Sequence, residues 1–327
     1  MNKLSFFIVG LLMVSTALAQ DTVRWDMHVA WPEANYHTQG TVTFAERLSE
    51  RSEGQINIIV HSGGALGYSG PEILRVVQRG ALPIAEVFMA NVIGDAPVFG
   101  LSEMPIVTEY DRAYELYQIA KPYYERALEQ QGQMLLYVAP WAPQGLYTQE
   151  PIETSAQLGR LRTRTAGPNI TRFIEEMGGS ALTIPFGDLF TSLATGLIDS
   201  VATSPETGVD ASLWEVTSYF IEDMVPVLLT DMVVVNTEAF SGLSEDLQQL
   251  VLEVAAELEP EMWEIAQERQ MVARERLVEE GITLLTPGDL PEEVQAARQE
   301  AIDAVVEAWL AEVGPDGEAI LTSFGER

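Results

Sequence analysis

The chain has 327 residues, of which 49 are Asp or Glu and only 18 are Lys or Arg, so its formal net charge is -31. A surface this acidic repels phosphates, which argues against nucleic acid and anionic membranes as partners. The chain has no cysteine, so disulfides cannot support the fold, and its 47% hydrophobic content indicates a globular protein with a large core. Lysine occurs only at Lys3 and Lys121. Acid-rich, lysine-poor surfaces of this kind are typical of proteins that work in high salt, where self-repulsion is screened.

Residues 1–20 have the pattern of an export signal peptide. Lys3 supplies a positive start, Leu4–Val14 an apolar stretch, and Ala17–Ala19 a cleavage site of the A-x-A kind. The apolar stretch is too short for a stable membrane span, and no later segment is long and apolar enough to form one. We therefore expect an exported mature protein with no direct membrane insertion.

The first half of the mature chain alternates strands with helices. Hydrophobic periodicity and glycine or proline punctuation predict strands at Val23–Ala30, Gln55–His61, Ala81–Met89 and Met134–Ala139, and helices at Tyr36–Ser52, Pro71–Arg79 and Glu109–Gln131. This order predicts an α/β lobe with helices on a mostly parallel sheet, formed by residues 21–140. The sequence PWAPQG then interrupts regular structure at Pro140–Gly145 and predicts a crossing into a second lobe.

The second half begins the same order again. Residues 141–229 form the predicted second lobe, with strands at Arg160–Arg164, Ala181–Ile184 and Ile198–Thr203 and helices at Ile170–Met177 and Pro185–Thr195. The strand Met232–Asn236 is expected to return to the first lobe, which takes up about residues 230–260. A very long helix, Ser244–Glu280, is expected to cross both lobes, and residues 261–327 continue it and add C-terminal helices such as Pro291–Val313. The predicted fold class is α/β, with two lobes joined by hinge strands.

Motifs for catalysis and metal binding are missing from the sequence. The three histidines, His28, His37 and His61, have no zinc-site spacing, and there is no G-x-S-x-G nucleophile motif. The segment Ser62–Gly67 follows a strand but lacks the G-K-[ST] of a phosphate loop, so we interpret it as a turn. Carboxylate pairs are too frequent in this chain to mark an active site. We expect a protein that is not an enzyme and has no metal or cofactor, with an exported enzyme acting on a small acid as the less favoured alternative.

One short stretch concentrates positive charge in this acidic chain. Gly159–Pro168 reads GRLRTRTAGP and holds Arg160, Arg162 and Arg164 in a strand-like alternation that ends at a turn before a helix. Side chains at such strand ends lie where α/β proteins bind ligands, and a guanidinium can hold a carboxylate with two parallel hydrogen bonds. Two interpretations stay open: the arginines offset the surrounding acid, or Arg164 binds the carboxylate of a ligand.

The chain resembles the solute-binding proteins of the TRAP (tripartite ATP-independent periplasmic) transporter family. The matching stretches extend from about Val23 to Trp263, and the most specific is Leu158–Gly208, with LGRLRTRTAGP, ALTIPF, SLATG and LID in order. The resemblance implies a two-lobe periplasmic-binding-protein fold that closes on a small-molecule carboxylate ligand and delivers it to TRAP membrane transporter subunits. It also implies a periplasmic location, and it places Arg164 on the arginine that usually binds the ligand carboxylate in this family.

One departure from the family pattern concerns the ligand class. Many members have Asn-Pro where this chain has DSVATSP at Asp199–Pro205, so Thr203 or Ser204 would supply the polar contact. Together with Trp214, this stretch resembles a subgroup associated with small hydroxy- or oxo-monocarboxylates more than with C4-dicarboxylates or sialic acid. A sensor module that presents the bound ligand to a receptor would have the same fold and cleft.

The other candidate ligand-binding residues each have a structural alternative. Asn35 would hydrogen-bond ligand oxygens or cap the helix that follows it, and Glu86 would accept from a ligand hydroxyl or form a salt bridge. The remaining candidates would line the cleft or pack in the lobe interface and core: Phe88, Trp141, Gln144, Phe186 and Trp214.

Overall fold

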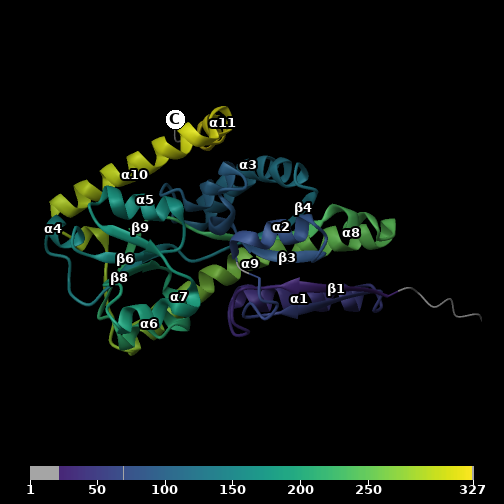
Figure 1. The fold of residues 1–327 in the computed structure, drawn as a ribbon, viewed down its shortest axis with the longest axis horizontal. Coiled ribbons are helices and arrows are strands. Elements are labelled where there is room, and N and C mark those ends of the chain that lie inside the picture. The colour runs from purple at the N-terminus through teal and green to yellow at the C-terminus, as the bar shows by residue number, and fades with distance from the viewer. Residues whose placement is uncertain (1–21, 69, 326–327) are drawn as a thin grey trace, which may run out of the picture.

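A computed structural model describes residues 22–68 and 70–325 and shows two β-sheets side by side (Figure 1). The first sheet has the strand order β2-β1-β3-β10-β4. Its strands are β1 (Val23–His28), β2 (Ile56–His61), β3 (Ile84–Phe88), β4 (Gln133–Pro140) and β10 (Thr230–Asn236). The pairs among β1, β2 and β3 are parallel, whereas β10 is antiparallel to both of its neighbours. Every residue of β10 is buried, and its apolar run MVVVN suits a strand that is covered on both faces.

Helices cover the first sheet. The helices α1 (Tyr36–Arg51) and α9 (Glu245–Glu279) pack against each other, α1 also packs on β2, and α9 also packs on β4. The other helical segments of this region are η1 (Gly70–Glu72), α2 (Ile73–Gln78), η2 (Met89–Val92), η3 (Pro97–Glu103), α3 (Tyr110–Glu129) and α8 (Thr237–Ser241). Together they enclose most of the larger buried apolar cluster, which includes the fully buried Phe44, Phe99 and Tyr137.

The second sheet has the strand order β11-β9-β5-β8-β6-β7. Its strands are β5 (Gln144–Thr148), β6 (Arg162–Thr165), β7 (Ser180–Thr183), β8 (Ser200–Thr203), β9 (Tyr219–Val225) and β11 (Thr283–Leu285). Here β5 is antiparallel to β8 and β9, while β6 is parallel to β7 and β8. The surrounding segments are α4 (Ser155–Leu158), α5 (Pro168–Glu176), η4 (Phe186–Asp188), α6 (Leu189–Ala194), α7 (Pro205–Asp210), η5 (Leu213–Glu215) and η6 (Pro287–Asp289).

Two short segments carry the chain between the sheets. The link from β4 to β5 and the link from β9 to β10 run side by side, because the Trp141 amide donates to the Leu229 carbonyl at 2.7 Å and the Gln144 amide to the Val227 carbonyl at 3.0 Å. A few residues at the ends of strands are the usual place where hinge rotation is absorbed. This paired crossing is therefore where one sheet would turn against the other.

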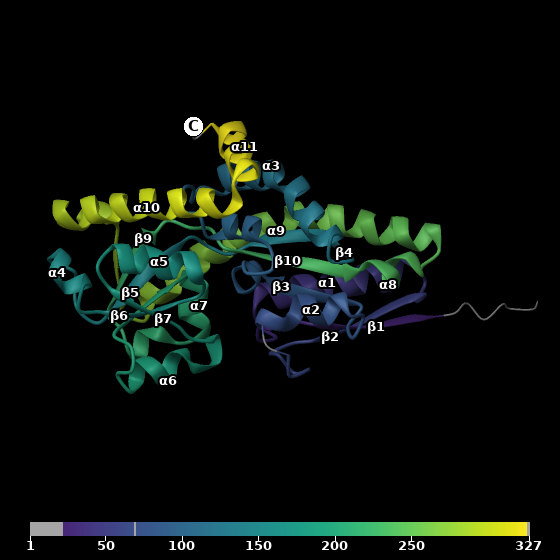
Figure 2. The ribbon, with the colours of Figure 1, turned by 45° about the horizontal axis from the view of Figure 1, so that its top comes forward.

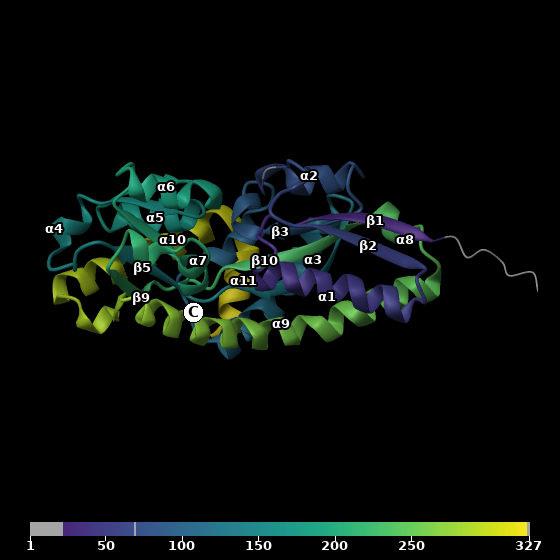
Figure 3. The ribbon, with the colours of Figure 1, turned by 90° about the horizontal axis from the view of Figure 1, so that it is seen from below.

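The C-terminal third of the chain spans both sheets. Helix α9 runs along the whole length of the molecule (Figure 3), and the strand after it, β11, pairs with β9 in the second sheet. Helix α10 (Glu292–Val313) then passes back over α5 toward α11 (Pro315–Phe324), which packs on α3 (Figure 2). Both long helices therefore connect the two lobes.

A buried carboxylate joins the first lobe to the second beside the crossing. The Glu103 Oε2 atom accepts a hydrogen bond from the Asn169 amide at 2.9 Å, in the first turn of α5, and the Glu103 Oε1 atom is buried without a partner. Burial raises the pKa of Glu103 to about 8, and the hydrogen bond from Asn169 opposes this rise only in part. This contact holds η3 against the start of α5.

The α/β class with two lobes and a long crossing helix is confirmed. Strand β5 begins at Gln144, inside the stretch Pro140–Gly145 that we expected to interrupt regular structure. Two further strands were not predicted: β9, whose IED stretch lacks regular alternation, and β11, which lies inside the segment 261–327 that we expected to be helical. Short strands with weak patterns depend on pairing partners that are distant in sequence. The predicted signal peptide lies outside the described residues, and no helix within 22–68 and 70–325 combines the length and apolar character that a bilayer crossing requires.

Candidate ligand-binding site

A small cavity lies where the two sheets meet at the crossing. Its volume is about 30 Å³, which is room for about two water molecules. Its walls come from both sheets and from the crossing: Trp31, Phe88, Trp141, Gln144, Arg164, Ala166, Phe186, Thr203, Thr207 and Leu229. Six of these ten residues are candidates from the sequence, so the structure brings most of the predicted site together.

Arg164 and Thr203 approach the cavity from adjacent parallel strands. Arg164 lies near the carboxyl end of β6, and Thr203 is the last residue of β8. The carboxyl ends of parallel strands are where open α/β sheets bind ligands. The turn after β6, through Gly167 to Pro168 at the start of α5, ends the strand as the sequence predicts.

The Arg164 guanidinium is buried but has no acidic partner. Its side chain is 7% exposed, and its Nε atom donates to the Ile184 carbonyl at 2.8 Å. Within residues 22–68 and 70–325, no carboxylate lies within ion-pair distance of Arg164, and no group accepts from its Nη atoms. Burial lowers the pKa of Arg164 to about 10, so it still carries its charge at neutral pH. Its outer edge can therefore receive a carboxylate.

The neighbouring arginine behaves differently. Arg162 is exposed and pairs with Asp199 through Nε–Oδ2 and Nη2–Oδ1 contacts of 2.8 Å each. Arg160 is exposed as well. The interpretation that the arginines offset nearby acid therefore fits Arg162, while Arg164 lacks such a partner.

Four aromatic side chains form one wall of the cavity, which we call the aromatic wall: Trp31, Phe88, Trp141 and Phe186. The Trp31 ring lies 4.7 Å from Trp141, 5.6 Å from Phe88 and 6.4 Å from Phe186 between centroids, each in an edge-on arrangement. Phe186 belongs to the second lobe, so the wall extends across the two lobes. The sequence analysis did not select Trp31, although an aromatic residue in the polar loop WPEANYH is the signal that could have found it.

The polar residues of the cavity are few. Gln144 donates through Nε2 to the Ala142 carbonyl at 2.8 Å, which leaves its Oε1 atom as an acceptor for a ligand. Of the two alternatives Thr203 and Ser204, Thr203 lines the cavity. The Ser204 hydroxyl instead caps α7 by accepting from the Thr207 amide at 3.2 Å.

Asn35 caps a helix, as one of its two interpretations predicted. Its Oδ1 atom accepts from the His37 amide at 2.9 Å at the start of α1. Its Nδ2 atom donates to Asp210 Oδ2 at 2.9 Å, which joins the first lobe to α7. Both ends of the amide are therefore engaged in the protein, and Asn35 does not line the cavity.

Trp214 also lies away from the cavity. It packs at the edge of the smaller apolar cluster of the second lobe, around Tyr147 and Phe220, and the Arg276 guanidinium lies 5.7 Å from its ring. The expectation that Trp214 walls the cleft is thus not met by its position, because η5 directs it toward α9.

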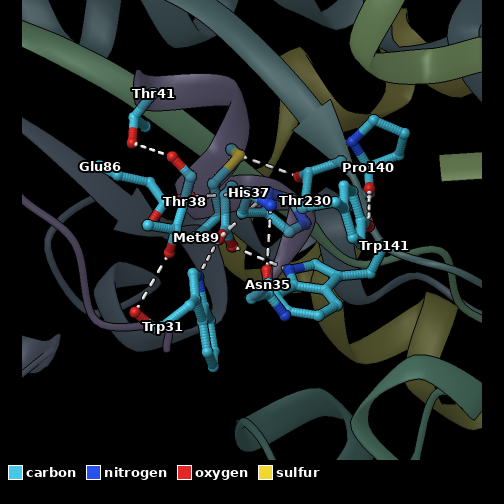
Figure 4. A network of polar contacts seen from close by, with 12 residues as sticks. Trp31, Asn35, His37, Thr38, Thr41, Glu86, Met89, Pro140, Trp141 and Thr230 are labelled. Atoms are coloured by element: carbon cyan, nitrogen blue, oxygen red, sulfur yellow. Dashed lines mark hydrogen bonds and ion pairs between the residues drawn. The ribbon is translucent and has the colours of Figure 1, made fainter. Parts of the chain in front are cut away.

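Glu86 lies behind the aromatic wall. It is buried beside His37 of α1, whose Nδ1 atom is 3.6 Å from Glu86 Oε1 (Figure 4). Asp231 of the neighbouring strand is buried beside both, with its Oδ2 atom 3.5 Å from His37 Nδ1. Burial raises the pKa of Glu86 well above its usual range, and the charge of Asp231 adds to this rise. Burial also lowers the pKa of His37 well below its usual value, so this histidine is neutral. Glu86 therefore neither contacts the cavity nor pairs with a cation.

Among the described residues, His37, Glu86 and Asp231 form the group whose side chains could together hold a metal ion. His37, Glu86 and Asp231 each offer one ligand atom, and these atoms lie within 4.8 Å of one another. One imidazole nitrogen and two carboxylate oxygens are donors that zinc can use. Asp231, however, already accepts two hydrogen bonds, from the indoles of Trp31 at 2.5 Å and Trp141 at 3.0 Å.

A larger groove lies on another part of the surface. It has a volume of about 570 Å³ and runs between residues 105–109 and helix α10. Its arginine, Arg298, donates to the carbonyls of Met224 and Asp223 at 3.0 and 2.7 Å. The groove thus lacks a free cation like that of Arg164, and we place the ligand site at the smaller cavity.

The two-lobe α/β fold, with a cavity at the crossing, is the architecture of the solute receptors to which the chain is similar. The chain belongs to family 7 of the bacterial extracellular solute-binding proteins (DctP), the TRAP solute-binding proteins, and the family profile matches residues 27–312. Proteins similar to this chain include a periplasmic binding protein of Escherichia coli and an extracytoplasmic solute receptor of Bordetella pertussis.

Relatives and solved structures match the chain over nearly its whole length. DctP6 of Bordetella pertussis, an extracytoplasmic solute receptor binding pyroglutamic acid, is 30% identical, with a TM-score of 0.88 over 93% of this chain and 100% of that one. A solute-binding protein of Chromohalobacter salexigens is 24% identical over 97% of this chain and 94% of its own length. A TRAP solute-binding protein structure from the same organism, with bound D-glucuronate, is 21% identical, with a TM-score of 0.83 over 92% of this chain and 99% of that one.

Proposed function

We propose that this chain is the receptor of a TRAP transporter that captures a small organic acid on Arg164 and delivers it to membrane subunits. The observation that carries the proposal is a buried arginine, 7% exposed as a residue, whose guanidinium has no described carboxylate partner. A buried charge without a counter-charge costs free energy, and a ligand carboxylate would remove that cost. The strong acidity of the chain makes such a local cation necessary for binding an anion.

The cavity favours a compact acid with one carboxylate. Of the described residues that line it, Arg164 is the only charged one. Gln144, Thr203 and Thr207 are further hydrogen-bonding side chains of the lining, although the Thr207 oxygen already accepts from the Ser204 hydroxyl at 3.0 Å. A hydroxy- or oxo-monocarboxylate with a small apolar body matches this set. Pyroglutamic acid, which DctP6 binds, is such an acid, because its ring has one carbonyl and one N–H. A uronic acid would place several hydroxyls against aromatic carbon and leave them unpaired.

Binding requires the site to open and close. The cavity of about 30 Å³ is smaller than any of these acids. Rotation at the paired crossing, residues 141–143 and 226–229, would admit the ligand between the two lobes. Closure then excludes water, which strengthens the pairing between Arg164 and the ligand carboxylate.

Calorimetric titration of the purified protein with a panel of acids tests this proposal. The panel contains L-pyroglutamate, lactate, pyruvate, succinate and D-glucuronate, and each titration is paired with a thermal unfolding scan. We expect a monocarboxylate to bind at one site, and at 100 times its Kd it should raise the free energy of unfolding by about 2.7 kcal/mol. A panel in which no acid binds, or in which an acid is converted to a product, would refute the proposed function.

A further inference from the structure

Asp231 lies directly behind the aromatic wall and touches both of its tryptophans. Its Oδ2 atom accepts from the Trp31 indole at 2.5 Å, and its Oδ1 atom accepts from the Trp141 indole at 3.0 Å. Asp231 itself is 1% exposed and does not line the cavity. Trp31 comes from the loop after β1 and Trp141 from the crossing, so one carboxylate joins two segments that are distant in sequence.

This geometry decides which atoms the wall presents to a ligand. An indole has one hydrogen-bond donor, its N–H. Because both N–H groups point at Asp231, the Trp31 and Trp141 surfaces that remain for the cavity are carbon. Phe88 and Phe186 add only carbon as well. Side-chain donors for a ligand must therefore come from the cavity residues outside the aromatic wall, such as Arg164 and the threonines.

We propose that Asp231 is a positioning residue that determines specificity. It holds the indole N–H groups of the aromatic wall turned away from the cavity, and the wall thereby selects acids with an apolar body over polyhydroxylated acids. The inference rests on the proposed function and extends it to the body of the ligand. Glu86 and His37 support the arrangement, because they enclose Asp231 from β3 and α1 and keep water away from it. The His37 ring also packs against Trp141 in a tilted arrangement, with 4.2 Å between ring centroids and 31° between the ring planes.

The test compares Asp231→Asn with wild type in titrations with L-pyroglutamate and D-glucuronate. Asparagine has nearly the same shape but only one acceptor oxygen, so one indole loses its partner. We expect the variant to bind L-pyroglutamate about tenfold more weakly. We also expect the ratio between the two affinities to shrink, because a freed indole N–H can serve a hydroxyl. A residue that only stabilised the fold would not change this ratio.

A double-mutant cycle shows whether Asp231 acts through the indoles. Trp31→Phe removes one N–H together with part of the wall. If Asp231 works by holding that N–H, Asp231→Asn adds less to the loss of affinity in the Trp31→Phe background than in wild type. Full additivity of the two losses would overturn the inference.

Two control variants make the same kinds of chemical change at buried residues that do not line the cavity. Glu259→Gln neutralises a buried carboxylate that accepts from Tyr117 and from the Val138 amide, and Trp309→Phe removes a buried indole N–H that donates to the Pro97 carbonyl. Neither residue lines the cavity, so both variants should keep the wild-type affinities and their ratio. Unchanged affinities in Asp231→Asn as well would overturn the inference.

The ligand-free protein supplies an independent measurement. The near-ultraviolet circular dichroism of the indoles should change in Asp231→Asn. If wild type binds no acid of the panel, the proposed function is refuted, and an unchanged indole signal would then refute the positioning role too. Stoichiometric zinc in the purified protein, measured by mass spectrometry, would also overturn it, because the Asp231 oxygens would then be metal ligands.

Discussion

Replacing Arg164 with methionine should separate ligand affinity from stability. Methionine keeps much of the length and apolar surface of the side chain but has no charge and no donor. Two charge-assisted hydrogen bonds to a ligand carboxylate, each worth about 1.5–3 kcal/mol, would be lost. We therefore expect Kd to rise by about 10² to 10⁴.

The ligand-free protein should respond in the opposite direction. Burial lowers the pKa of Arg164 from 12.5 to about 10, which corresponds to a cost of about 3 kcal/mol for burying its charge. Arg164→Met removes this cost and loses the 2.8 Å hydrogen bond to the Ile184 carbonyl, worth about 1 kcal/mol. The free energy of unfolding without ligand should therefore rise by about 1–2 kcal/mol.

Urea unfolding without ligand and calorimetric titration with the best acid of the panel measure the two effects. Arg162→Met is the matched control, because Arg162 lies two residues earlier on the same strand and pairs with Asp199 at the surface. It should leave the affinity unchanged and alter stability by less than about 1 kcal/mol. The reasoning is wrong if Arg164→Met binds the acid as tightly as wild type, or if the ligand-free variant is several kcal/mol less stable.

Three further predictions concern the structure around the site. Because the folded-state pKa of Glu103 is raised to about 8 from 4.5, its contribution to stability is fully present below pH 4.5 and falls by about 1.4 kcal/mol per pH unit up to pH 8. Glu103→Gln should reduce the pH dependence of stability by this amount in urea titrations at pH 5 and pH 8, and an unchanged pH dependence would contradict the assignment. Gly145→Ala would place Cβ 2.5 Å from the Ile221 carbonyl oxygen across β5 and β9, so unfolding should be easier by about 1–3 kcal/mol; a neutral result in chemical denaturation would count against that packing. Tyr36→Phe removes a buried hydrogen bond of 2.5 Å to the Pro140 carbonyl and should cost about 1–3 kcal/mol by the same assay, whereas wild-type stability would show that the bond contributes nothing.

The sequence predicted the structure best where the hydrophobic pattern and the backbone preferences of glycine, proline and capping residues indicate the same element. The turn Gly167-Pro168 ends β6 after Arg164, and proline can begin a helix because its missing N–H has no partner there. The run MVVVN similarly predicted the strand β10, and its return to the first sheet is confirmed. Long helices were also readable, since α9 begins after the Ser244 cap and ends before Gly281.

The features that could not be predicted from the sequence depend on pairing between residues that are distant in the chain. Strand β11 has three residues and forms only against β9. Asp231 was not selected because an acid at the start of a valine-rich strand has no local sign of its two indole partners, which lie 200 and 90 residues away. For Asn35, the sequence predicted the local helix cap but not the contact to Asp210 in the other lobe.

The strand β11 has a consequence for how the chain folds. The sheet of the second lobe is complete only when the residues after α9 have paired with β9. A fragment that ends before α9 would therefore expose β9 as an open sheet edge, a surface that invites aggregation. Neither lobe is a contiguous piece of chain. Strand β10 joins the first sheet after the chain has formed β5 to β9 of the second, and β11 then joins the second sheet. Contacts of this long range make folding slow. Because neither lobe is complete without distant strands, we expect the two lobes to fold together and not one after the other.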